Sequence, residues 1–399
     1  MKILYFYQYF STPKGSWGTR VYEFARNWVE QGHEVTVVTS IYSKSDLVAN
    51  KFLETQYIDG IKVKIVNVII DNKQKALKRI WTWLVYLFFS SWYALFLSAD
   101  IVIASSGPIT VGFPGLVARY FRKRKFVFEA RDIWPQTVIE MGMLKNKLLQ
   151  RFSYWFEKKC YKASSHVITL SSGMVNDILS RFPETKVTSV PNSANIVLFS
   201  NPSSHEINEW RDRKYAIYTG NIGVVNNSEW LLDTAVELTK RGRNDIYILL
   251  IGEGPLKTDL ANKAGQMGID NFIIMSLISK TDLVAYIQHA MVSLVPLQSF
   301  PILSTSSPNK FFESLAAGVP VIQNTNGWMK DFLEKHEIGF TIESDDYRSL
   351  ANVLIQIADK EIDITKMQVT AKTIAAKEFD KDVLAEKMLC VLKSVVNTN

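Results

Sequence analysis

The sequence has few residues of the kinds that form disulfides or hold metal ions. Two cysteines, Cys160 and Cys390, occur among 399 residues, so a disulfide-framed extracellular scaffold is excluded and a reducing compartment fits the composition. The five histidines show no spacing typical of a zinc site. We therefore predict no metal ion and no disulfide framework.

The sequence contains no internal repeat and no low-complexity segment. We also expect no N-terminal signal segment, because Met1-Lys2 leads directly into the strand-like Ile3–Tyr7. One uncharged segment, Ile80–Leu97, has 18 residues, the lower limit for a membrane-spanning helix. Its eight aromatic residues and Ser90-Ser91 favour an interfacial or half-buried helix instead. A core helix remains the alternative for so short an apolar segment.

The net charge of +7 is unevenly distributed, with +12 in residues 1–200 and −5 in residues 201–399. A basic surface fits nucleic acid or an anionic membrane. Cations flank the aromatic segment on both sides: Lys73, Lys75, Lys78 and Arg79 before it, and the cluster Arg119–Lys125 after it. A solvated helix end would also explain that cluster. Aromatic residues beside cations favour the membrane, so we predict a cytoplasmic protein whose N-terminal half contacts the anionic inner face of the cytoplasmic membrane, without nucleic acid.

Strand-like and helical patterns alternate along the chain, which predicts an α/β fold of doubly wound parallel sheets. In the first half we expect strands at Ile3–Tyr7, Glu34–Thr39, Lys62–Val68, Ile101–Ala104, Phe126–Glu129, His166–Leu170 and Val187–Val190, and helices at Thr19–Glu30, Ile80–Leu97, Val111–Tyr120, Leu144–Tyr161 and Gly173–Ser180. In the second half we expect strands at Tyr215–Thr219, Ile246–Ile251, Phe272–Met275, Val292–Val295, Val319–Ile322 and Gly339–Ile342, and helices at Glu229–Arg241, Pro255–Met267, Lys280–His289 and Pro308–Ala317.

This alternation predicts two Rossmann-like domains that face one another across a cleft. The first is expected to span residues 1–195 and the second residues 214–375. A polar, turn-rich segment that carries Pro202 joins them as a linker, residues 196–213. Residues 376–399 are expected to form a C-terminal helix that packs back on the first domain.

The most informative segment runs from Ser307 to Ile322. Ser307 is a suitable N-cap, Pro308 fits the first helical position, and Gly318 fits a left-handed C-terminal residue. Lys310 and Glu313 lie three residues apart and therefore share a helix face. Lysine at a positive helix end suits a phosphate group, and a carboxylate one turn later suits sugar hydroxyls, so the helix predicts a nucleotide-sugar site.

The simpler interpretation of this helix is an amphipathic element whose Lys310 and Glu313 form a solvated ion pair. Strand-like segments on both sides favour the binding site instead, because they place the helix start at the carboxyl edge of a parallel sheet, where ligands of such folds bind.

Four other segments are expected at the same kind of sheet edge. A loop with Gly15 and Gly18 follows the first strand, and Gly220–Gly223 and Gly252–Pro255 follow strands of the second half. Glu129–Pro135 places Arg131 and Asp132 after a buried strand, where they could orient or deprotonate a hydroxyl. A structural salt bridge between these two residues is the alternative.

Taken together, these segments resemble glycosyltransferase family 4, the large retaining family with the GT-B fold, over nearly the whole chain. The pattern Glu-x-Arg-Asp-x-Trp-Pro, matched from Glu129 to Pro135, is similar to the subgroup that adds amino or deoxy sugars to lipid-linked O-antigen and capsule precursors. "AAGVPVI" after Glu313 and "GEGP" at 252–255 belong to the same resemblance.

The resemblance implies roles for particular residues. Lys310 would contact the donor diphosphate, Glu313 the nucleotide ribose, and Asp132, with Arg131 beside it, the acceptor hydroxyl. The remaining donor-binding residues would be Gly15, Gly18, Gly220, Asn221, Glu253, Gly254, Ile278 and Asn309. It also implies no bound metal, because cationic side chains and helix dipoles offset the charge of the leaving group.

The sequence departs from the family pattern at several positions, among them Asn192–Asn195, which replaces the usual Asn-Gly-Val-Asp. Thr305 occupies the place of the first glutamate of the Glu-x7-Glu motif, and Asn221 and Asn226 occupy the places of an arginine and a lysine. Losing two cations would weaken diphosphate stabilisation by several kcal/mol unless another base compensates.

We therefore predict a metal-independent retaining transferase. It would move a hexose or N-acetylhexosamine-type sugar from a nucleoside diphosphate donor, with UDP as the expected nucleotide, to a polyprenyl-diphosphate-linked saccharide. Two alternatives remain: a nucleotide-sugar 2-epimerase of the same fold, and a non-catalytic subunit that binds a glycan or a partner transferase.

Overall fold

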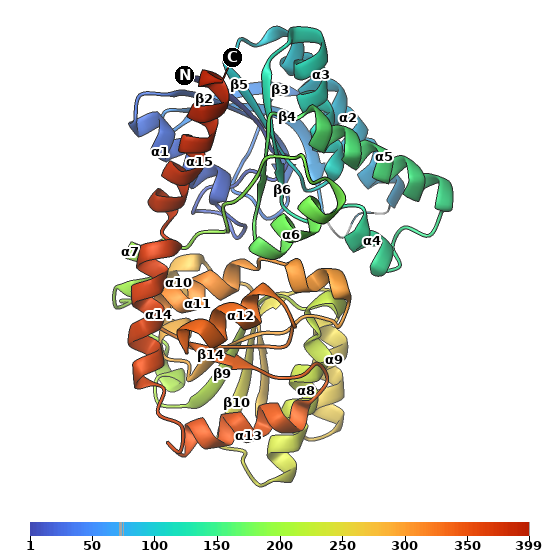
Figure 1. Ribbon diagram of the computed structural model, residues 1–399. Coiled ribbons are helices and arrows are strands. Elements are labelled where there is room, and N and C mark those ends of the chain that lie inside the picture. Colours follow the sequence, from blue (N-terminus) through green and yellow to red (C-terminus); the bar gives the residue numbers. More distant parts are fainter. Residues whose placement is uncertain (72–73, 75, 399) are drawn as a thin grey trace. The chain divides into compact units, whose positions relative to one another are not determined.

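The computed structural model describes residues 1–71, 74 and 76–398, which form two compact units (Figure 1). The first unit combines Met1–Pro191 with Lys381–Asn399, and the second spans Asn192–Asp380. Each unit is an α/β structure built on one sheet, as the alternating sequence pattern predicts.

The first unit contains an eight-stranded sheet in the order β3-β4-β2-β1-β5-β6-β7-β8. Its strands are β1 (Lys2–Phe6), β2 (Glu34–Tyr42), β3 (Leu53–Ile58), β4 (Ile61–Ile70), β5 (Ile101–Ser105), β6 (Lys125–Ala130), β7 (His166–Thr169) and β8 (Val187–Ser189). All neighbours pair in parallel except β3 and β4.

Helices cover this sheet, and they are α1 (Arg20–Glu30), α2 (Ala76–Phe96), α3 (Gly112–Arg122), α4 (Gln136–Glu140), α5 (Lys147–Ala163), α6 (Ser172–Arg181) and α15 (Lys381–Asn397). Alternate residues of β1, such as Ile3 and Tyr5, pack in one core cluster with residues of α1 and α15. On α2, the Tyr86 hydroxyl donates to the Val38 carbonyl of β2 at 2.8 Å, which anchors that helix to the sheet.

The antiparallel strand β3 is an element that the sequence analysis did not identify. It pairs with β4 at the edge of the sheet, and its residues are alternately exposed and half-buried. Because an edge strand buries little side-chain surface, its sequence, Leu-Glu-Thr-Gln-Tyr-Ile, lacks the continuous apolar run by which the buried strands were recognised.

The second unit contains a six-stranded parallel sheet in the order β11-β10-β9-β12-β13-β14. Its strands are β9 (Lys214–Asn221), β10 (Ile246–Glu253), β11 (Phe272–Met275), β12 (Val292–Val295), β13 (Val321–Gln323) and β14 (Gly339–Thr341). Its helices are α7 (Ile196–Ser200), α8 (Ser228–Lys240), α9 (Lys257–Gln266), α10 (Lys280–Gln288), α11 (Asn309–Ala317), α12 (Trp328–His336), α13 (Tyr347–Ala358) and α14 (Thr365–Glu378).

The segment that we expected to act as a linker, residues 196–213, lies within the second unit. It contains α7 and a short 3-10 helix, Asn208–Trp210, and it buries Phe199 and Trp210. At the end of the chain, α15 belongs to the first unit, where the indole nitrogen of Trp28 donates to the Ala385 carbonyl at 3.0 Å.

The start of α11 differs from the prediction by one residue. Pro308, not Ser307, occupies the N-cap position with an extended backbone, and its side chain makes no capping hydrogen bond. The Ser307 hydroxyl is buried without a hydrogen-bond partner in the described part of the chain. Gly318 ends the helix in the left-handed conformation, with φ of 76°, as predicted.

Candidate functional site

Lys310, in the first turn of α11, lies against the end of the neighbouring strand β9. Its ammonium nitrogen is 3.7 Å from the centroid of the Tyr218 ring. Gly220 follows two residues after Tyr218, and a β-carbon built there would be 3.4 Å from the Lys310 nitrogen. The fold therefore brings together Lys310 and Gly220, two residues that the sequence analysis had placed in separate motifs.

The environment of Lys310 disfavours its charged form. Burial lowers the pKa of Lys310 to about 7, and the nearby Glu313 carboxylate opposes this shift. Within the described residues Lys310 makes no ion-pair contact, and its ammonium group lies over the aromatic face of Tyr218. Such an ammonium group is well suited to an anion that enters the site.

Glu313 pairs with a residue that the sequence analysis missed. Lys280, the first residue of α10, forms an ion pair with the buried Glu313 carboxylate. The simpler interpretation of α11, a solvated pair between Lys310 and Glu313, is therefore wrong. No local pattern identified Lys280, because α10 and α11 are separated by β12 along the chain and meet only in the folded unit.

The glycines at the ends of β9 and β10 are explained by different physical constraints. Gly220 has φ of 128°, a backbone conformation that strongly favours glycine. A β-carbon at Gly252 would come within 1.8 Å of the Gly220 carbonyl oxygen, and one at Gly254 within 2.1 Å of the Ile222 carbonyl oxygen. Gly252 and Gly254 thus allow the two strand ends to pack closely, whereas a β-carbon at Gly220 would reach only van der Waals contact with Lys310.

Glu253 is held at the end of β10 by Lys257 of α9. The Lys257 ammonium donates to Glu253 Oε1 at 2.7 Å and to the Ser276 hydroxyl at 2.9 Å. Glu253 therefore lies near the start of the segment after β11 that leads to the half-buried Ile278. The exposed Asn221 is paired in register with Glu253, so the two predicted residues lie at the same sheet edge.

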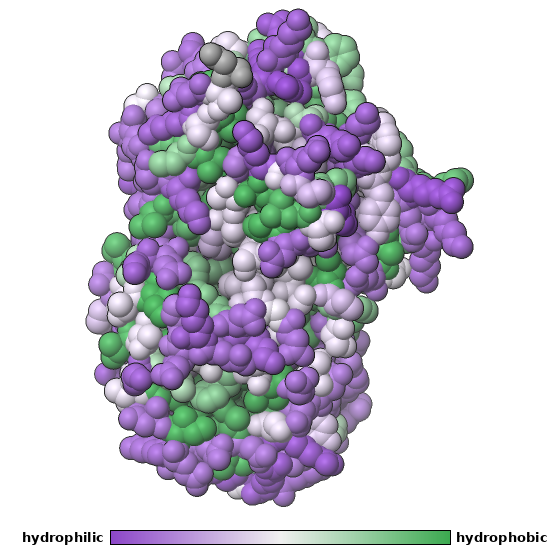
Figure 2. Space-filling model, in the orientation of Figure 1, coloured by the Kyte–Doolittle hydropathy of each residue, from purple (hydrophilic) through white to green (hydrophobic). Residues whose placement is uncertain are grey.

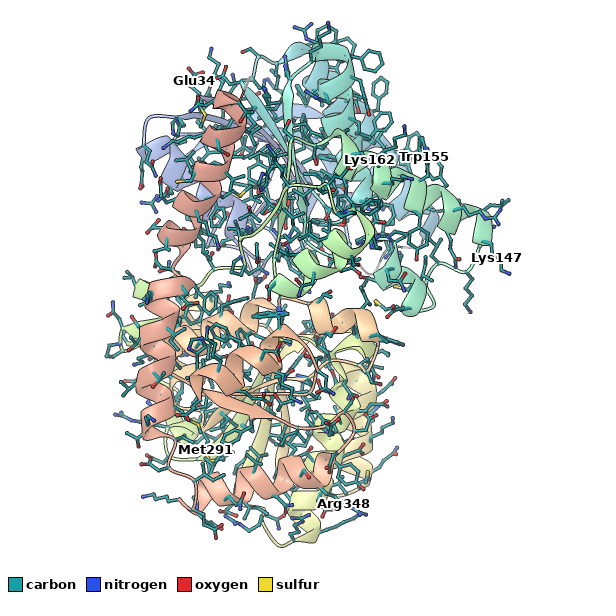
Figure 3. The ribbon with its side chains drawn as sticks, viewed as in Figure 1. Glu34, Lys147, Trp155, Lys162, Met291 and Arg348 are labelled. Atoms are coloured by element: carbon teal, nitrogen blue, oxygen red, sulfur yellow. The ribbon has the colours of Figure 1, made fainter. Side chains whose placement is uncertain are left out.

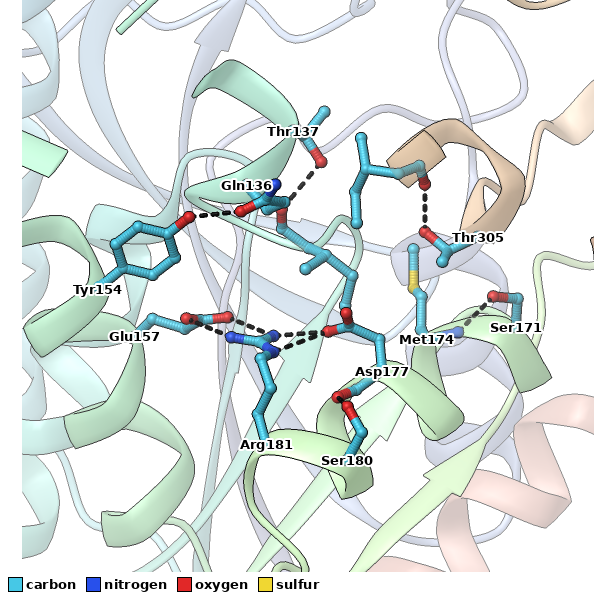
Figure 4. Close-up of polar contacts among 12 residues, drawn as sticks. Gln136, Thr137, Tyr154, Glu157, Ser171, Met174, Asp177, Ser180, Arg181 and Thr305 are labelled. Atoms are coloured by element: carbon cyan, nitrogen blue, oxygen red, sulfur yellow. Dashed lines mark hydrogen bonds and ion pairs between the residues drawn. The ribbon is translucent and has the colours of Figure 1, made fainter. Parts of the chain in front are cut away.

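The positions that depart from the family pattern have local roles in the fold. The Thr305 hydroxyl donates to the Ile302 carbonyl at 2.7 Å within a short 3-10 helix, Pro301–Thr305 (Figure 4). Asn226 ends another 3-10 helix, Val224–Asn226, just before α8. Asn309, which was predicted to bind the donor and does not depart from the pattern, is the half-buried first residue of α11, next to Lys310.

In the first unit, Arg131 and Asp132 follow β6 at the carboxyl edge of the sheet. The Arg131 guanidinium lies 5.1 Å from the centroid of the Tyr7 ring, and one of its terminal nitrogens is buried without a partner in the described residues. Arg131 and Asp132 form no ion-pair contact, so the structural salt bridge between them is not present in the described chain. Asp132 is exposed, and its pKa is raised because nearby protein removes part of its hydration, an effect that Arg131 opposes.

The charged partner of the buried Glu129 is Arg20, a pair that the sequence analysis did not predict. Arg20 Nε donates to Glu129 Oε1 at 2.9 Å, and the Tyr5 hydroxyl donates to Glu129 Oε2 at 2.7 Å. Arg20 also donates to the Val190 carbonyl at 2.8 Å. This fully buried network fixes the start of α1 against β6 and therefore supports the loop that carries Gly15 and Gly18.

The Gly15 loop is held by Asp46, which accepts hydrogen bonds from the backbone and hydroxyl of Thr12 at 2.8 and 2.6 Å. These bonds lower the pKa of Asp46 despite its partial burial. A β-carbon at Gly15 would lie 2.2 Å from the Ser11 hydroxyl. Gly15 is therefore needed for the loop to fold closely on itself, and Gly18 lies half-buried three residues later.

A second polar network positions the helix after Arg131 and Asp132 (Figure 4). The Tyr154 hydroxyl of α5 donates to Gln136 in α4, and the Thr137 hydroxyl donates to the Ile133 carbonyl at 2.9 Å. The Arg181 guanidinium binds Glu157 with two hydrogen bonds of 2.8 and 2.9 Å. Together these contacts tie α4, α5 and α6 together beside the Arg131–Asp132 segment.

Comparison with known proteins assigns both halves of the chain to one group of enzymes. The family described as "Glycosyltransferase Family 4" matches residues 18–197, and the family described as "Glycosyl transferases group 1" matches residues 213–360. The chain is thus a glycosyltransferase of the family 4 or group 1 type. The family resemblance predicted from the motifs is thus confirmed at this level.

Individual relatives are distant but extend over most of this transferase. The probable glycosyltransferase WbjE of Pseudomonas aeruginosa is 20% identical over 319 residues, which cover 75% of each chain. Sucrose-phosphate synthase of Thermosynechococcus elongatus has a TM-score of 0.75 at 15% identity, with complete coverage of both chains. Anabaena HepE, solved with UDP and glucose, has a TM-score of 0.69 at 14% identity and covers 99% of this chain and 100% of its own. These structures confirm the GT-B fold.

Proposed function

We propose that this transferase moves a hexose or N-acetylhexosamine-type sugar from a UDP-sugar to a polyprenyl-diphosphate-linked saccharide, with retention of the anomeric configuration. The product would belong to the synthesis of a surface polysaccharide. The donor half of the proposal depends on the position of Lys310 at the start of α11. Its ammonium group lies beside Gly220 of β9 and has no ion-pair partner in the described residues.

The donor site is supported by the complementary chemistry of three residues in the second unit. A diphosphate would accept hydrogen bonds from the Lys310 ammonium and from backbone N–H groups at the start of α11. The Glu313 carboxylate, one turn later and paired with Lys280, would accept hydrogen bonds from the ribose hydroxyls. The complex of the similarly folded HepE with UDP agrees with a uridine nucleotide.

In the proposed reaction, the bond from the anomeric carbon to the diphosphate oxygen breaks, and an acceptor hydroxyl oxygen bonds to the same carbon from the same face. Lys310 and the helix start would stabilise the negative charge that develops on the departing UDP. A phosphate oxygen of UDP would take the acceptor proton, while Asp132, with Arg131 beside it, would orient the acceptor hydroxyl. No step requires a metal ion.

The acceptor half of the proposal is supported by the composition of the first unit. Its basic charge and its exposed aromatic residues suit a substrate that is anchored in a membrane and carries a diphosphate.

The test measures UDP binding by titration calorimetry and UDP release in the presence of lipid-linked saccharides and a panel of UDP-sugars. We expect UDP to bind, and UDP release to require both one donor and an acceptor. Proton NMR of the product is expected to give the anomeric configuration of the donor. Inversion would contradict the retaining mechanism.

Lys310→Ala and the exposed Lys335→Ala form a matched pair for this test. We expect only Lys310→Ala to lose UDP affinity, by about tenfold to a hundredfold for one charge-assisted contact. If UDP binds to the wild-type protein but no donor and acceptor support its release, the proposed enzyme activity is wrong and a non-catalytic binding role replaces it.

A further inference from the structure

The helix α2 buries the side of its surface that is least apolar. Thr82, Tyr86, Ser90 and Ala94, spaced four residues apart, are all at most 4% exposed. Three of these four side chains make internal hydrogen bonds: Thr82 donates to the Lys78 carbonyl, Tyr86 to Val38, and Ser90 to the Leu87 carbonyl. These small or hydrogen-bonded side chains form the contact with the rest of the first unit.

The opposite side of α2 carries its large apolar residues. Six of them are between 53% and 83% exposed: Leu77, Trp81, Leu84, Phe88, Trp92 and Phe96. A helix of a soluble monomer normally buries such residues and exposes the polar ones. The orientation of α2 is the reverse, which indicates that its outer side has a partner outside this chain.

The apolar surface continues onto α3 and α5. Exposed residues of these helices are Phe113, Tyr120 and Phe121 in α3, and Leu148, Leu149, Phe152 and Trp155 in α5. Two open grooves connect the three helices, and both are lined by Phe113, Val117 and Phe121 of the central helix α3. We call these exposed apolar residues of α2, α3 and α5 the apolar platform.

Cations accompany the apolar platform, and carboxylates are nearly absent from it. The three helices carry nine Lys and Arg residues and one carboxylate, Glu157, whose side chain is 1% exposed and paired with Arg181. Lys147 lies at the projecting N-terminal end of α5, where hydrophilic side chains cover the surface, and Trp155 lies two turns further along the helix (Figures 2 and 3).

We propose that the apolar platform inserts into the interface of an anionic lipid bilayer, with the surrounding Lys and Arg side chains bound to lipid phosphates. Aromatic side chains beside cations are the composition that suits this interface. A second copy of the chain is a poorer occupant, because a two-fold contact would bring like charges together. In the described ranges no helix is long and apolar enough to cross a membrane, so the insertion would be shallow.

This inference goes beyond the proposed sugar transfer and is tested without any substrate. The full-length protein is mixed with sedimentable vesicles of phosphatidylcholine alone, or of phosphatidylcholine with phosphatidylglycerol. We expect binding to the anionic vesicles, weaker binding at high salt, and little binding to the neutral ones. Absence of binding to anionic vesicles would overturn the proposal.

Two pairs of variants separate the platform from general surface effects. Phe88→Ser with Trp92→Ser should lower vesicle affinity at least tenfold, whereas Met267→Ser with Val369→Ser, equally exposed apolar residues of the second unit, should not. Arg119→Gln with Arg122→Gln should weaken binding to anionic vesicles by about tenfold, and Lys335→Gln with Lys377→Gln should leave it unchanged. Equal loss in both members of a pair would contradict the proposal.

A fluorescent label gives a readout that is independent of affinity. An environment-sensitive dye at Phe88→Cys, in a Cys390→Ser background, should shift to shorter wavelength when anionic vesicles are added, and the same dye at Val369→Cys should not. Sedimentation equilibrium then tests whether a second copy of the chain covers the apolar platform. A dimer that dissociates in the Phe88→Ser/Trp92→Ser variant, with no dye shift on vesicles, would assign the platform to a second copy.

Discussion

Glu313 in α11 forms its ion pair with Lys280 in α10 and not with Lys310, although Lys310 lies only three residues before it on the same helix. The negative charge of Glu313 is therefore balanced by a lysine of the neighbouring helix α10. Lys310 instead rests over the Tyr218 ring with a lowered pKa. The site consequently contains two lysines, of which one compensates a carboxylate and the other is available to an anion.

Lys310→Ala should reduce transfer activity more than Asp132→Asn. Asn221 and Asn226 replace two cations of the family pattern, so in the proposed reaction Lys310 would carry a larger share of the stabilisation of the departing diphosphate. We expect kcat/KM to fall about a hundredfold to a thousandfold for Lys310→Ala, as for the loss of one preorganised electrostatic contact. Asp132→Asn should cost about tenfold, since its proposed role is orientation. Steady-state kinetics of UDP release measures both values, and the reverse order would contradict this assignment.

Lys280→Met should weaken UDP binding even though Lys280 belongs to none of the motifs. Removing its ammonium leaves the buried Glu313 carboxylate without a partner, and the negative charge would then oppose the nearby diphosphate. We expect the Kd for UDP to rise about tenfold. Lys330→Met, a half-buried lysine of α12, is the control. In the double variant Lys280→Met/Glu313→Gln, part of the lost affinity should return, and a purely additive loss would exclude this coupling.

UDP affinity should depend on pH through Lys310. Its pKa of about 7 in the free protein means that most molecules carry a neutral Lys310 at pH 8, whereas a bound diphosphate raises this pKa by adding negative charge nearby. Binding at pH 8 should therefore take up a proton, and the affinity should fall as the pH rises from about 7 to 9. Below pH of about 6 the terminal phosphate of UDP becomes protonated and affinity should fall again.

Calorimetry in two buffers with different ionisation enthalpies measures this proton uptake. The Lys310→Met variant should show none at pH 8. If the variant takes up as many protons as the wild-type protein, another group is responsible for the pH dependence.

Gly220→Ala should lose UDP affinity in addition to stability. The new methyl group would be in van der Waals contact with the Lys310 ammonium group and would occupy space beside it, and the φ of 128° would strain an alanine by about 1–3 kcal/mol. Gly268→Ala is the matched control, because Gly268 also has a positive φ, of 64°, but a β-carbon added there would meet nothing within 4 Å. Both variants should unfold at lower temperature, and only Gly220→Ala should bind UDP more weakly. Equal UDP affinity in the two variants would mean that the space beside Lys310 is not required.

The buried strands of both sheets could be predicted because continuous apolar segments such as Phe126–Glu129 have one stable place, the interior of a parallel sheet. The edge strand β3 could not, because its exposure pattern is shared by many surface segments. Likewise, the motif residues Lys310, Glu313 and Gly220 could be proposed from local spacing, whereas Lys280 and Arg20 have no local feature that distinguishes them from other basic residues.

The sequence by itself determined the α/β alternation, the position of each motif at the carboxyl end of a strand, and the membership in glycosyltransferase family 4. These depend on local periodicity and spacing, which the chain carries wherever it folds. Only the tertiary structure decided that Lys280 balances Glu313, that Arg20 balances Glu129, and that the aromatic side of α2 is exposed. Charge pairing and burial depend on which distant elements meet, and that is set by packing of the whole unit.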